Sequence, residues 1–246
     1  MNTRVMAHRG ASGYAPENTM EAFEKALSLG ADGIELDVHI CKSGELVVIH
    51  DEQVDRTTNG SGFVKDLSLT ELKALDAGSF FRDSFKGAQI PTLIEVLDLI
   101  KNTNTFLNIE LKNAPILYPQ LEERTIQLLH DYHMTDRCIL SSFNHYSLRH
   151  CKEIDAQIKT GILYAAGLYK PWDYCKTLMA DAIHPLFYGV NPEIVMGCKA
   201  NHIAINTWTV NEEDYMLKLA QAQVEGLITN YPDKALAAVK TAKGGL

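Results

Sequence analysis

Three acidic residues sit in apolar segments of the chain, where their carboxylates could bind a metal ion. Glu35 and Asp37 alternate with apolar residues in 33–41, and Glu110 does so in 106–111. Successive side chains of a strand point to opposite faces, so these carboxylates would share the face away from the apolar residues. Three such carboxylates on neighbouring strands must take up protons or hold a cation. Oxygen ligands favour a hard divalent ion such as Mg²⁺ or Ca²⁺.

Two histidines and two cationic residues stand at the ends of similar segments. His8 and Arg9 end the first apolar segment, His50 ends another, and Lys112 follows Glu110. Two histidines of opposite protonation state could act as general base and general acid. Arg9 and Lys112 could bind an anionic group such as a phosphate. Two other interpretations stay open: the cations could only pair with the carboxylates, or Lys112 could form a Schiff base, as in an aldolase.

Short β-type segments alternate with helical patterns along the chain. This alternation predicts parallel strands with right-handed crossovers, and a single domain of about 250 residues favours an α/β barrel. Active sites of such barrels lie at the carboxyl ends of the strands, where the candidate residues fall. The nine predicted strands are Val5–Ala7, Gly33–Cys41, Glu45–Ile49, Phe106–Leu111, Cys138–Ser142, Lys159–Tyr164, Ala182–Phe187, Ile203–Trp208 and Gly226–Thr229.

One of these nine segments is expected to form a hairpin rather than a barrel strand. Only five residues separate Ile40 from Leu46, whereas a parallel crossover needs about a dozen or more. The segment 45–49 therefore returns antiparallel to the second strand. Eight parallel strands remain, which predicts an α/β fold of the TIM-type (β/α)8 barrel class with a hairpin after strand 2.

The hairpin and the segment after it are expected to shape the site. A two-residue loop at 43–44 would set Asp37 opposite His50. The chain then makes a long excursion over 52–90, rich in turn signals. Such an excursion inside a compact domain is usually a functional loop or a small subdomain. Because it follows His50 directly, we expect a small insertion that covers the site, within a single catalytic domain spanning 1–246.

Capping residues indicate where several helices begin. A Ser, Thr or Asn followed three residues later by Glu can satisfy the free backbone N–H groups of a first helical turn. Proline suits the first position of a helix. The predicted starts are Asn18 with Glu21, Ser68 with Glu71, Thr92 with Glu95, and Pro232 for the last helix.

Composition and charge limit the class of partner. The 246 residues include 23 Lys and Arg against 31 Asp and Glu, a net charge of −8, which argues against a nucleic-acid binder. The five cysteines are odd in number and form no CxxC pair, which indicates a reducing compartment. The first ten residues hold no apolar stretch, and no apolar run reaches about 18 residues. We therefore expect no signal peptide, no membrane span and a cytoplasmic location.

The segments that carry these residues resemble the glycerophosphodiester phosphodiesterase family. The signal lies in the order and spacing of the His-Arg-Gly, Glu-Asn-Thr, Glu-x-Asp and His-Asp motifs, and the similarity extends from His8 to about Asp233. The similar segments are Ala7-His8-Arg9-Gly10, Ala15-Pro16-Glu17-Asn18-Thr19, Gly33-Ile34-Glu35-Leu36-Asp37-Val38, Val48-Ile49-His50-Asp51, Arg56-Thr57-Thr58-Asn59-Gly60, Ile109-Glu110-Leu111-Lys112, Leu140-Ser141-Ser142-Phe143 and Trp208-Thr209-Val210-Asn211.

This resemblance implies a TIM-type barrel with a small insertion after the second histidine motif. It implies hydrolysis of a small-molecule glycerophosphodiester to glycerol 3-phosphate and an alcohol, with one divalent metal ion, Mg²⁺ or Ca²⁺. The first nucleophile, water or the neighbouring glycerol hydroxyl, stays open, as does the oligomeric state, monomer or homodimer. The matching residues are His8 and His50 as the acid–base pair, Arg9 and Lys112 for the phosphate, Glu35, Asp37 and Glu110 for the metal, Glu17 and Asn18 as support, and Phe143 and Trp208 beside the glycerol.

Two alternative functions use the same residues. A lysophospholipase D or phospholipase D-like enzyme would act on lipid diesters and would need an apolar rim. Phe80, Phe81, Phe85 and the 168–172 loop could form that rim, although buried packing is the commoner role of such side chains. A phosphate-binding module without catalysis is the other alternative, and the complete set of histidines and carboxylates argues against it.

Overall fold

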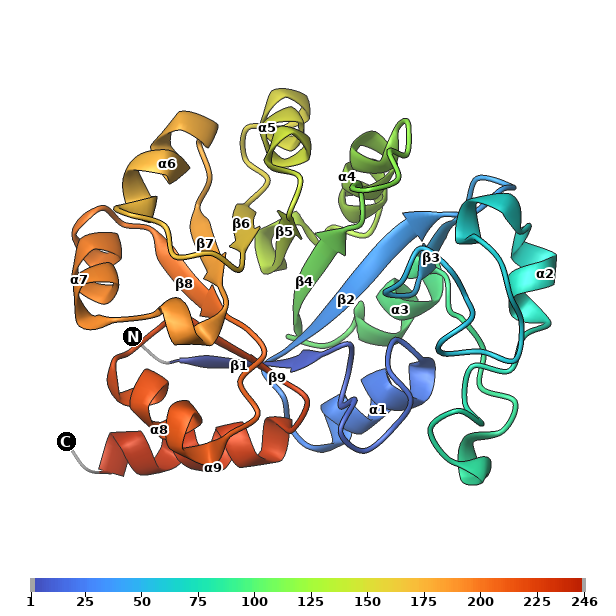
Figure 1. Ribbon diagram of the computed structural model, residues 1–246, viewed down its shortest axis with the longest axis horizontal. Coiled ribbons are helices and arrows are strands. Elements are labelled where there is room, and N and C mark those ends of the chain that lie inside the picture. Colours follow the sequence, from blue (N-terminus) through green and yellow to red (C-terminus); the bar gives the residue numbers. More distant parts are fainter. Residues whose placement is uncertain (1–2, 245–246) are drawn as a thin grey trace.

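Within residues 3–244, which the computed structural model describes, eight parallel strands close into a barrel (Figure 1). The ring runs β1-β9-β8-β7-β6-β5-β4-β2, and pairing of β1 with β2 closes it. This confirms the predicted TIM-type (β/α)8 barrel. The ring strands are β1 (Arg4–His8), β2 (Gly33–Ile40), β4 (Phe106–Leu111), β5 (Cys138–Ser142), β6 (Thr160–Tyr164), β7 (Ala182–Pro185), β8 (Ala204–Thr207) and β9 (Gly226–Thr229), and β3 (Leu46–Val48) pairs antiparallel with β2.

Helices surround the barrel, as the alternating pattern predicted (Figure 1). Among the described residues, no helix is long and apolar enough to cross a membrane. The helices are α1 (Met20–Ser28), α2 (Leu69–Lys73), α3 (Leu93–Ile100), α4 (Leu121–Asp131), α5 (His145–Ile154), α6 (Pro171–Leu178), α7 (Pro192–Ala200), α8 (Glu213–Gln221) and α9 (Pro232–Gly244).

The apolar core determines which face of β2 points inward. Ile34, Leu36 and Val38 are fully buried and pack in one cluster with side chains of α1, α3 and α4. Full burial of such a side chain contributes about 1.5–3 kcal/mol relative to exposure, so these three residues hold the strand in this orientation. Glu35 and Asp37 then face the barrel interior, as the alternation predicted.

The predicted capping boxes at Ser68 and Thr92 form, but the first helix begins differently. Its N-cap is Thr19, whose hydroxyl accepts a hydrogen bond from the Ala22 N–H. Asn18 lies one residue earlier with a positive φ of 56°. Its side-chain amide donates to Asp37 Oδ2 at 2.9 Å. The helix-start prediction at Asn18 was therefore wrong by one residue, because this side chain serves a strand carboxylate instead.

The hairpin of β2 and β3 forms one residue away from the predicted register. Val38 pairs with Val48, and the connecting loop holds three residues instead of two. Gly44 ends this loop with a φ of +101°, a conformation that glycine adopts readily and that three-residue hairpin loops use. The prediction that Asp37 lies opposite His50 is therefore wrong.

His50 reaches the barrel mouth by leaving the hairpin. The Ile49 N–H still donates to the Asp37 carbonyl at 3.1 Å, which is the last bond given between the two strands at this end. The chain leaves the hairpin after Ile49, and β3 itself ends at Val48. The His50 side chain consequently lies in the mouth pocket although the register behind it differs from the prediction.

Residues 52–90 fold next to β3 and α3 (Figure 1). Val54 and Leu72 are fully buried in an apolar cluster with Ile49, separate from the clusters of the barrel. No described residue of 52–90 lines the pocket at the mouth. That the insertion covers the site stays a prediction.

Candidate active site

The carboxyl ends of the strands bring the predicted residues into one pocket. His8 ends β1, Glu35 lies on β2 and Glu110 on β4, while His50 arrives from the hairpin. The pocket is lined by His8, Arg9, Glu35, His50, Asn108, Glu110, Ser141, Phe143, Leu163, Trp208, Thr209 and Ile228. Side chains from opposite sides of the barrel therefore meet at the end where barrel enzymes carry their chemistry.

The three carboxylates form a buried cluster, of which Glu35 and Glu110 line this pocket and Asp37 does not. One oxygen of each of Glu35, Asp37 and Glu110 lies within 4.8 Å of the others. Burial, followed by the nearby Asp37 charge, raises the pKa of Glu35 well above its ordinary value and raises the pKa of Glu110 as well. Asp37 Oδ1 is buried and accepts no hydrogen bond from any residue that the structure describes. A group of oxygens in this arrangement could hold a metal ion.

Two cations face the three carboxylates. Lys112 Nζ lies 2.9 Å from Glu110 Oε1 and 3.8 Å from Asp37 Oδ1. Arg9 Nε lies 3.5 Å from Asp37 Oδ2, and the Arg9 backbone N–H donates to Glu35 Oε2 at 2.9 Å. Burial alone would raise the pKa of Asp37, but Lys112 and Arg9 lower it below its ordinary value. The ion pairs considered from the sequence are therefore present for Asp37 and Glu110.

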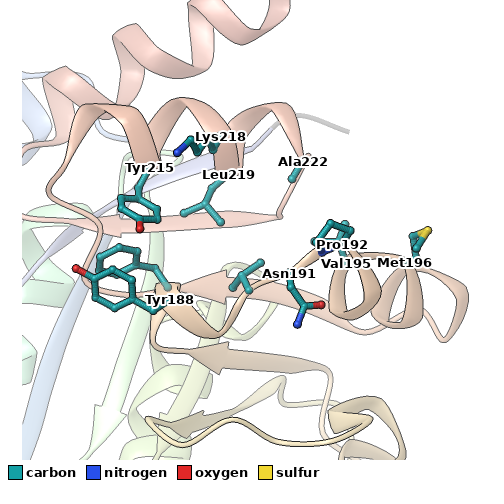
Figure 2. A pocket seen from close by; sticks show the side chains of 11 residues that line it. Tyr188, Asn191, Pro192, Val195, Met196, Tyr215, Lys218, Leu219 and Ala222 are labelled. Atoms are coloured by element: carbon teal, nitrogen blue, oxygen red, sulfur yellow. The ribbon is translucent and has the colours of Figure 1, made fainter.

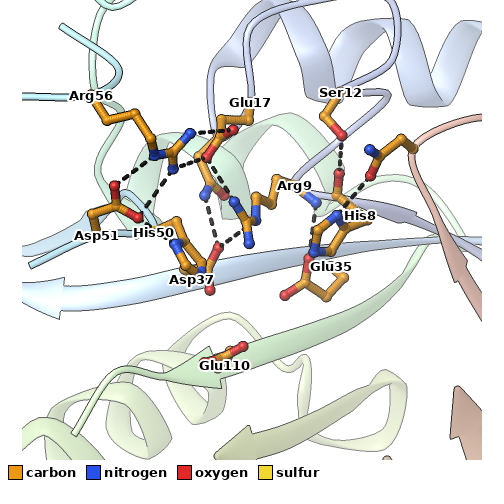
Figure 3. A network of polar contacts seen from close by, with 12 residues as sticks. His8, Arg9, Ser12, Glu17, Glu35, Asp37, His50, Asp51, Arg56 and Glu110 are labelled. Atoms are coloured by element: carbon orange, nitrogen blue, oxygen red, sulfur yellow. Dashed lines mark hydrogen bonds and ion pairs between the residues drawn. The ribbon is translucent and has the colours of Figure 1, made fainter. Parts of the chain in front are cut away.

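A hydrogen bond to the side chain of Asn230 fixes the orientation of the His8 ring. Its Nδ1 lies 2.7 Å from the side-chain Oδ1 of Asn230, so Nδ1 carries a proton and donates it (Figure 3). Burial, together with the neighbouring Arg9 charge, lowers the pKa of His8 to about 4. The imidazole is therefore neutral at pH 7, and its Nε2 is a free acceptor.

His50 has a charged partner instead. Its Nδ1 lies 2.5 Å from Asp51 Oδ1, and Asp51 in turn accepts from the guanidinium of Arg56. Burial would raise the pKa of Asp51, but the bonds from Arg56 and His50 lower it to about 2. The Asp51 carboxylate therefore faces Nδ1 of His50, whereas a neutral amide oxygen faces Nδ1 of His8.

The remaining predicted residues flank the pocket. Glu17 accepts a hydrogen bond from Arg9 Nη1 at 2.9 Å, and Asn18 contacts Asp37 as described above. Phe143 and Trp208 meet edge to face, with ring centroids 5.6 Å apart. In contrast, none of the side chains expected as an apolar rim, Phe80, Phe81, Phe85 and the 168–172 loop, lines this pocket.

A larger apolar pocket lies on the outer surface between α7 and α8 (Figure 2). Its volume is about 510 Å³, and Tyr188, Val195 and Leu219 are among its walls. The described residues that line it include no histidine and no carboxylate. It therefore lacks the groups that acid–base or metal chemistry needs, and the mouth of the barrel is the candidate active site.

Sequence reasoning did not assign roles to Asn230, Asp51 or Arg56. Asp51 and Arg56 stood in segments that carry the family resemblance, without a function attached to either. Asn230 directly follows β9, so its place at the carboxyl end of a predicted strand was the signal that could have found it. Its contact with His8 spans 222 positions of the chain, which no local pattern shows.

Together, the fold and the pocket define an enzyme built on an α/β barrel. The family model described as "Glycerophosphoryl diester phosphodiesterase family" matches residues 8–234. The chain belongs to this family of phosphodiesterases, which confirms the resemblance stated from its motifs.

Individual relatives agree with this assignment. A glycerophosphodiester phosphodiesterase of Caldanaerobacter subterraneus subsp. tengcongensis is 49% identical over 245 residues, which cover 100% of both chains. A phosphodiesterase of Oleispira antarctica, solved in complex with the product sn-glycerol-3-phosphate, is 31% identical with a TM-score of 0.87 and covers 97% of each chain. A glycerophosphodiester phosphodiesterase of Agrobacterium tumefaciens is 30% identical with a TM-score of 0.85, covering 96% of this chain and 99% of that one. These comparisons do not favour the lipid-directed alternative.

Proposed function

We propose that the protein hydrolyses glycerophosphodiesters to glycerol 3-phosphate and an alcohol, using a divalent metal ion. The observation that carries the proposal is the buried cluster of Glu35, Asp37 and Glu110 beside two histidines, one bonded through Nδ1 to an amide oxygen and the other to a carboxylate. The bound product of the Oleispira relative is the product that this reaction would release.

The carboxylate cluster fits a hard cation. The buried Asp37 Oδ1 favours one, since it accepts no hydrogen bond from any residue of 3–244 and lies 3.8 Å from Lys112 Nζ. Glu35, Asp37 and Glu110 would hold Mg²⁺ or Ca²⁺, which neutralises phosphate oxygens and stabilises the charge of the transition state. Arg9 and Lys112 bind the same phosphate from the protein side. Phe143 and Trp208 cover the glycerol.

The hydrogen-bond partners of the histidines assign the two proton transfers. His8, neutral with Nδ1–H held by Asn230, offers Nε2 as the general base toward the nucleophile, water or the neighbouring glycerol hydroxyl. His50, whose Nδ1 contacts the Asp51 carboxylate, is assigned as the general acid that gives its Nε2 proton to the leaving alkoxide. Removing a general acid or base costs about 10²–10⁴-fold in rate. Both histidine-to-alanine variants are therefore expected to lose at least about 10²-fold in kcat.

Release of product tests the proposal directly. We expect the purified protein to release glycerol 3-phosphate from glycerophosphocholine, EDTA to abolish the release, and added Mg²⁺ or Ca²⁺ to restore it. Release that persists in EDTA would contradict the metal proposal. Trapping of a carbonyl substrate on Lys112 by borohydride would instead favour the aldolase alternative.

Leaving-group dependence tests which histidine is the acid. A p-nitrophenyl glycerophosphodiester releases an aryl oxide that needs no protonation. We expect His50→Ala to recover most of its lost kcat on this substrate, and His8→Ala to stay impaired. Equal impairment of both variants on both substrates would overturn the assignment.

The remaining features of the proposal concern the chain as a whole. We propose that 1–246 acts as one catalytic domain, with 52–90 as a small insertion, on a small-molecule substrate. The five cysteines are buried and free, which supports a reducing compartment such as the cytoplasm.

A further inference from the structure

The side chain of Arg56 joins the carboxylates of Asp51 and Glu17, neither of which lines the pocket (Figure 3). Its Nε donates to Asp51 Oδ2 at 2.6 Å and its Nη2 to Asp51 Oδ1 at 3.1 Å. Its Nη1 donates to Glu17 Oε2 at 3.0 Å and its Nη2 to Glu17 Oε1 at 2.7 Å. One guanidinium is thus bonded to both oxygens of two different carboxylates, a fork geometry that only arginine provides.

Each carboxylate supports a different residue of the pocket. Asp51 Oδ1 bonds to Nδ1 of His50, and Glu17 Oε1 accepts from Nη1 of Arg9. No bond joins Asp51 to Glu17 among the described contacts, so Arg56 is the link between them. Without its positive charge, the two carboxylates would repel each other and lose a fixed position.

The backbone around Arg56 is anchored on both sides. Val54 is fully buried, and its N–H donates to the Gly62 carbonyl at 3.0 Å. Thr58 Oγ1 donates to the Val54 carbonyl at 2.7 Å and accepts from the Gly60 N–H at 3.1 Å. Isolated exposed ion pairs contribute little to structure, but a bidentate pair on a fixed backbone holds its partners in place.

We propose that Arg56 is a positioning residue that couples the orientation of His50, through Asp51, to the orientation of Arg9, through Glu17. The insertion thereby contributes to the reaction although it does not line the pocket. This inference rests on the proposed roles of His50 in proton transfer and Arg9 in phosphate binding.

Variants of Arg56 test this role through two kinetic readouts. We expect Arg56→Ala to lower kcat on glycerophosphocholine by about 10–100-fold, the usual cost of losing a partner that orients an active-site residue. The inhibition constant of sn-glycerol 3-phosphate should rise, because Arg9 loses its support. Arg56→Lys should recover part of the loss, since an ammonium can hold one carboxylate but not both. Arg82→Ala, in the same insertion, is the matched control and should match the wild type.

A mutant cycle separates coupling from simple structural support. Asp51→Asn and Glu17→Gln should show non-additive effects on kcat in the wild-type background, and additive effects once Arg56 is alanine. Additivity in both backgrounds would overturn the proposal, as would an Arg56→Ala variant within about twofold of wild-type kcat. Melting temperatures of all variants identify any loss caused by unfolding.

Histidine ¹⁵N NMR gives a readout that needs no activity. We expect the His50 ring resonances of Arg56→Ala to shift toward those of Asp51→Asn, and His8 resonances to stay unchanged; His50→Gln identifies the signals. Unchanged His50 resonances would overturn the positioning role even in an active enzyme. If wild-type protein releases no glycerol 3-phosphate with any metal but the His50 shift occurs, the proposed function fails while the link through Arg56 holds.

Discussion

At the scale of residues, two identical side chains acquire different chemistry from their neighbours. An amide oxygen faces Nδ1 of His8, whereas a carboxylate faces Nδ1 of His50. The amide oxygen fixes the His8 ring and its tautomer, and the carboxylate fixes the His50 ring and places a negative group beside it. Asn230 and Asp51 are therefore as informative about the reaction as the histidines themselves.

Asn230 is expected to matter through the orientation of His8. Asn230→Ala removes the acceptor of Nδ1–H and should lower kcat by about 10–100-fold with little change in melting temperature. Asn230→Asp keeps an acceptor at the same place and should retain more activity than the alanine variant. Steady-state kinetics of the two variants on glycerophosphocholine check both predictions. An alanine variant as active as the wild type would contradict this role of Asn230.

At the scale of elements, the insertion has a core of its own. Leu72 of α2 is fully buried among Val54, Val64 and Ile49, the last of which directly precedes His50. The cluster therefore connects the packing of residues 52–90 to the end of the hairpin. This connection is the physical reason to treat the insertion as part of the catalytic domain.

Leu72→Ala tests whether the insertion and the barrel unfold together. Replacing a buried leucine by alanine lowers the free energy of unfolding by about 2–5 kcal/mol. If the two parts form one cooperative unit, urea denaturation should show a single transition shifted to lower urea. A second transition, with the barrel transition unchanged, would show that the insertion unfolds independently. Exposed Lys65→Ala in the same insertion is the matched control and should change the free energy of unfolding by less than about 0.5 kcal/mol.

At the scale of the whole molecule, the carboxylate cluster links stability to pH and metal. The folded state raises the pKa of Glu35 and Glu110 above the ordinary 4.5, so it binds protons more tightly than the unfolded chain does. The metal-free protein therefore loses stability as pH rises above about 4.5. Asp37, whose pKa is lowered, stays ionised throughout this range.

Metal binding should reverse this loss. A cation that binds only the folded state, present at 100 times its Kd, raises the free energy of unfolding by about 2.7 kcal/mol. We expect Mg²⁺ or Ca²⁺ to raise the melting temperature more at pH 8 than at pH 5, because protons compete for the carboxylates at the lower pH. Glu35→Gln with Glu110→Gln should remove the effect. A larger increase at pH 5 than at pH 8 would contradict the cluster as the metal site.

Local physics was enough to predict the barrel and the histidines, carboxylates and arginine of the pocket, whereas Phe143 and Trp208 came from the family resemblance. The two-residue period of strands assigns Glu35 and Asp37 to the interior, because the apolar residues between them must be buried. The connection between Ile40 and Leu46 is too short for a parallel crossover. The segment after it was therefore not counted as a barrel strand, which left eight parallel strands. Those steps depend on neighbours in sequence and on nothing else.

Only the tertiary structure decided the hairpin register and the residues behind the histidines. The register depends on the backbone conformation of Gly44, which sequence allows but does not require. Asn230 meets His8 because closure of the barrel joins β9 to β1, and Arg56 meets Glu17 because the insertion packs against the hairpin. Sequence alone determined which side chains point inward, since that is local geometry. Which of these side chains contact one another depends on closure of the barrel, which joins segments far apart in the sequence.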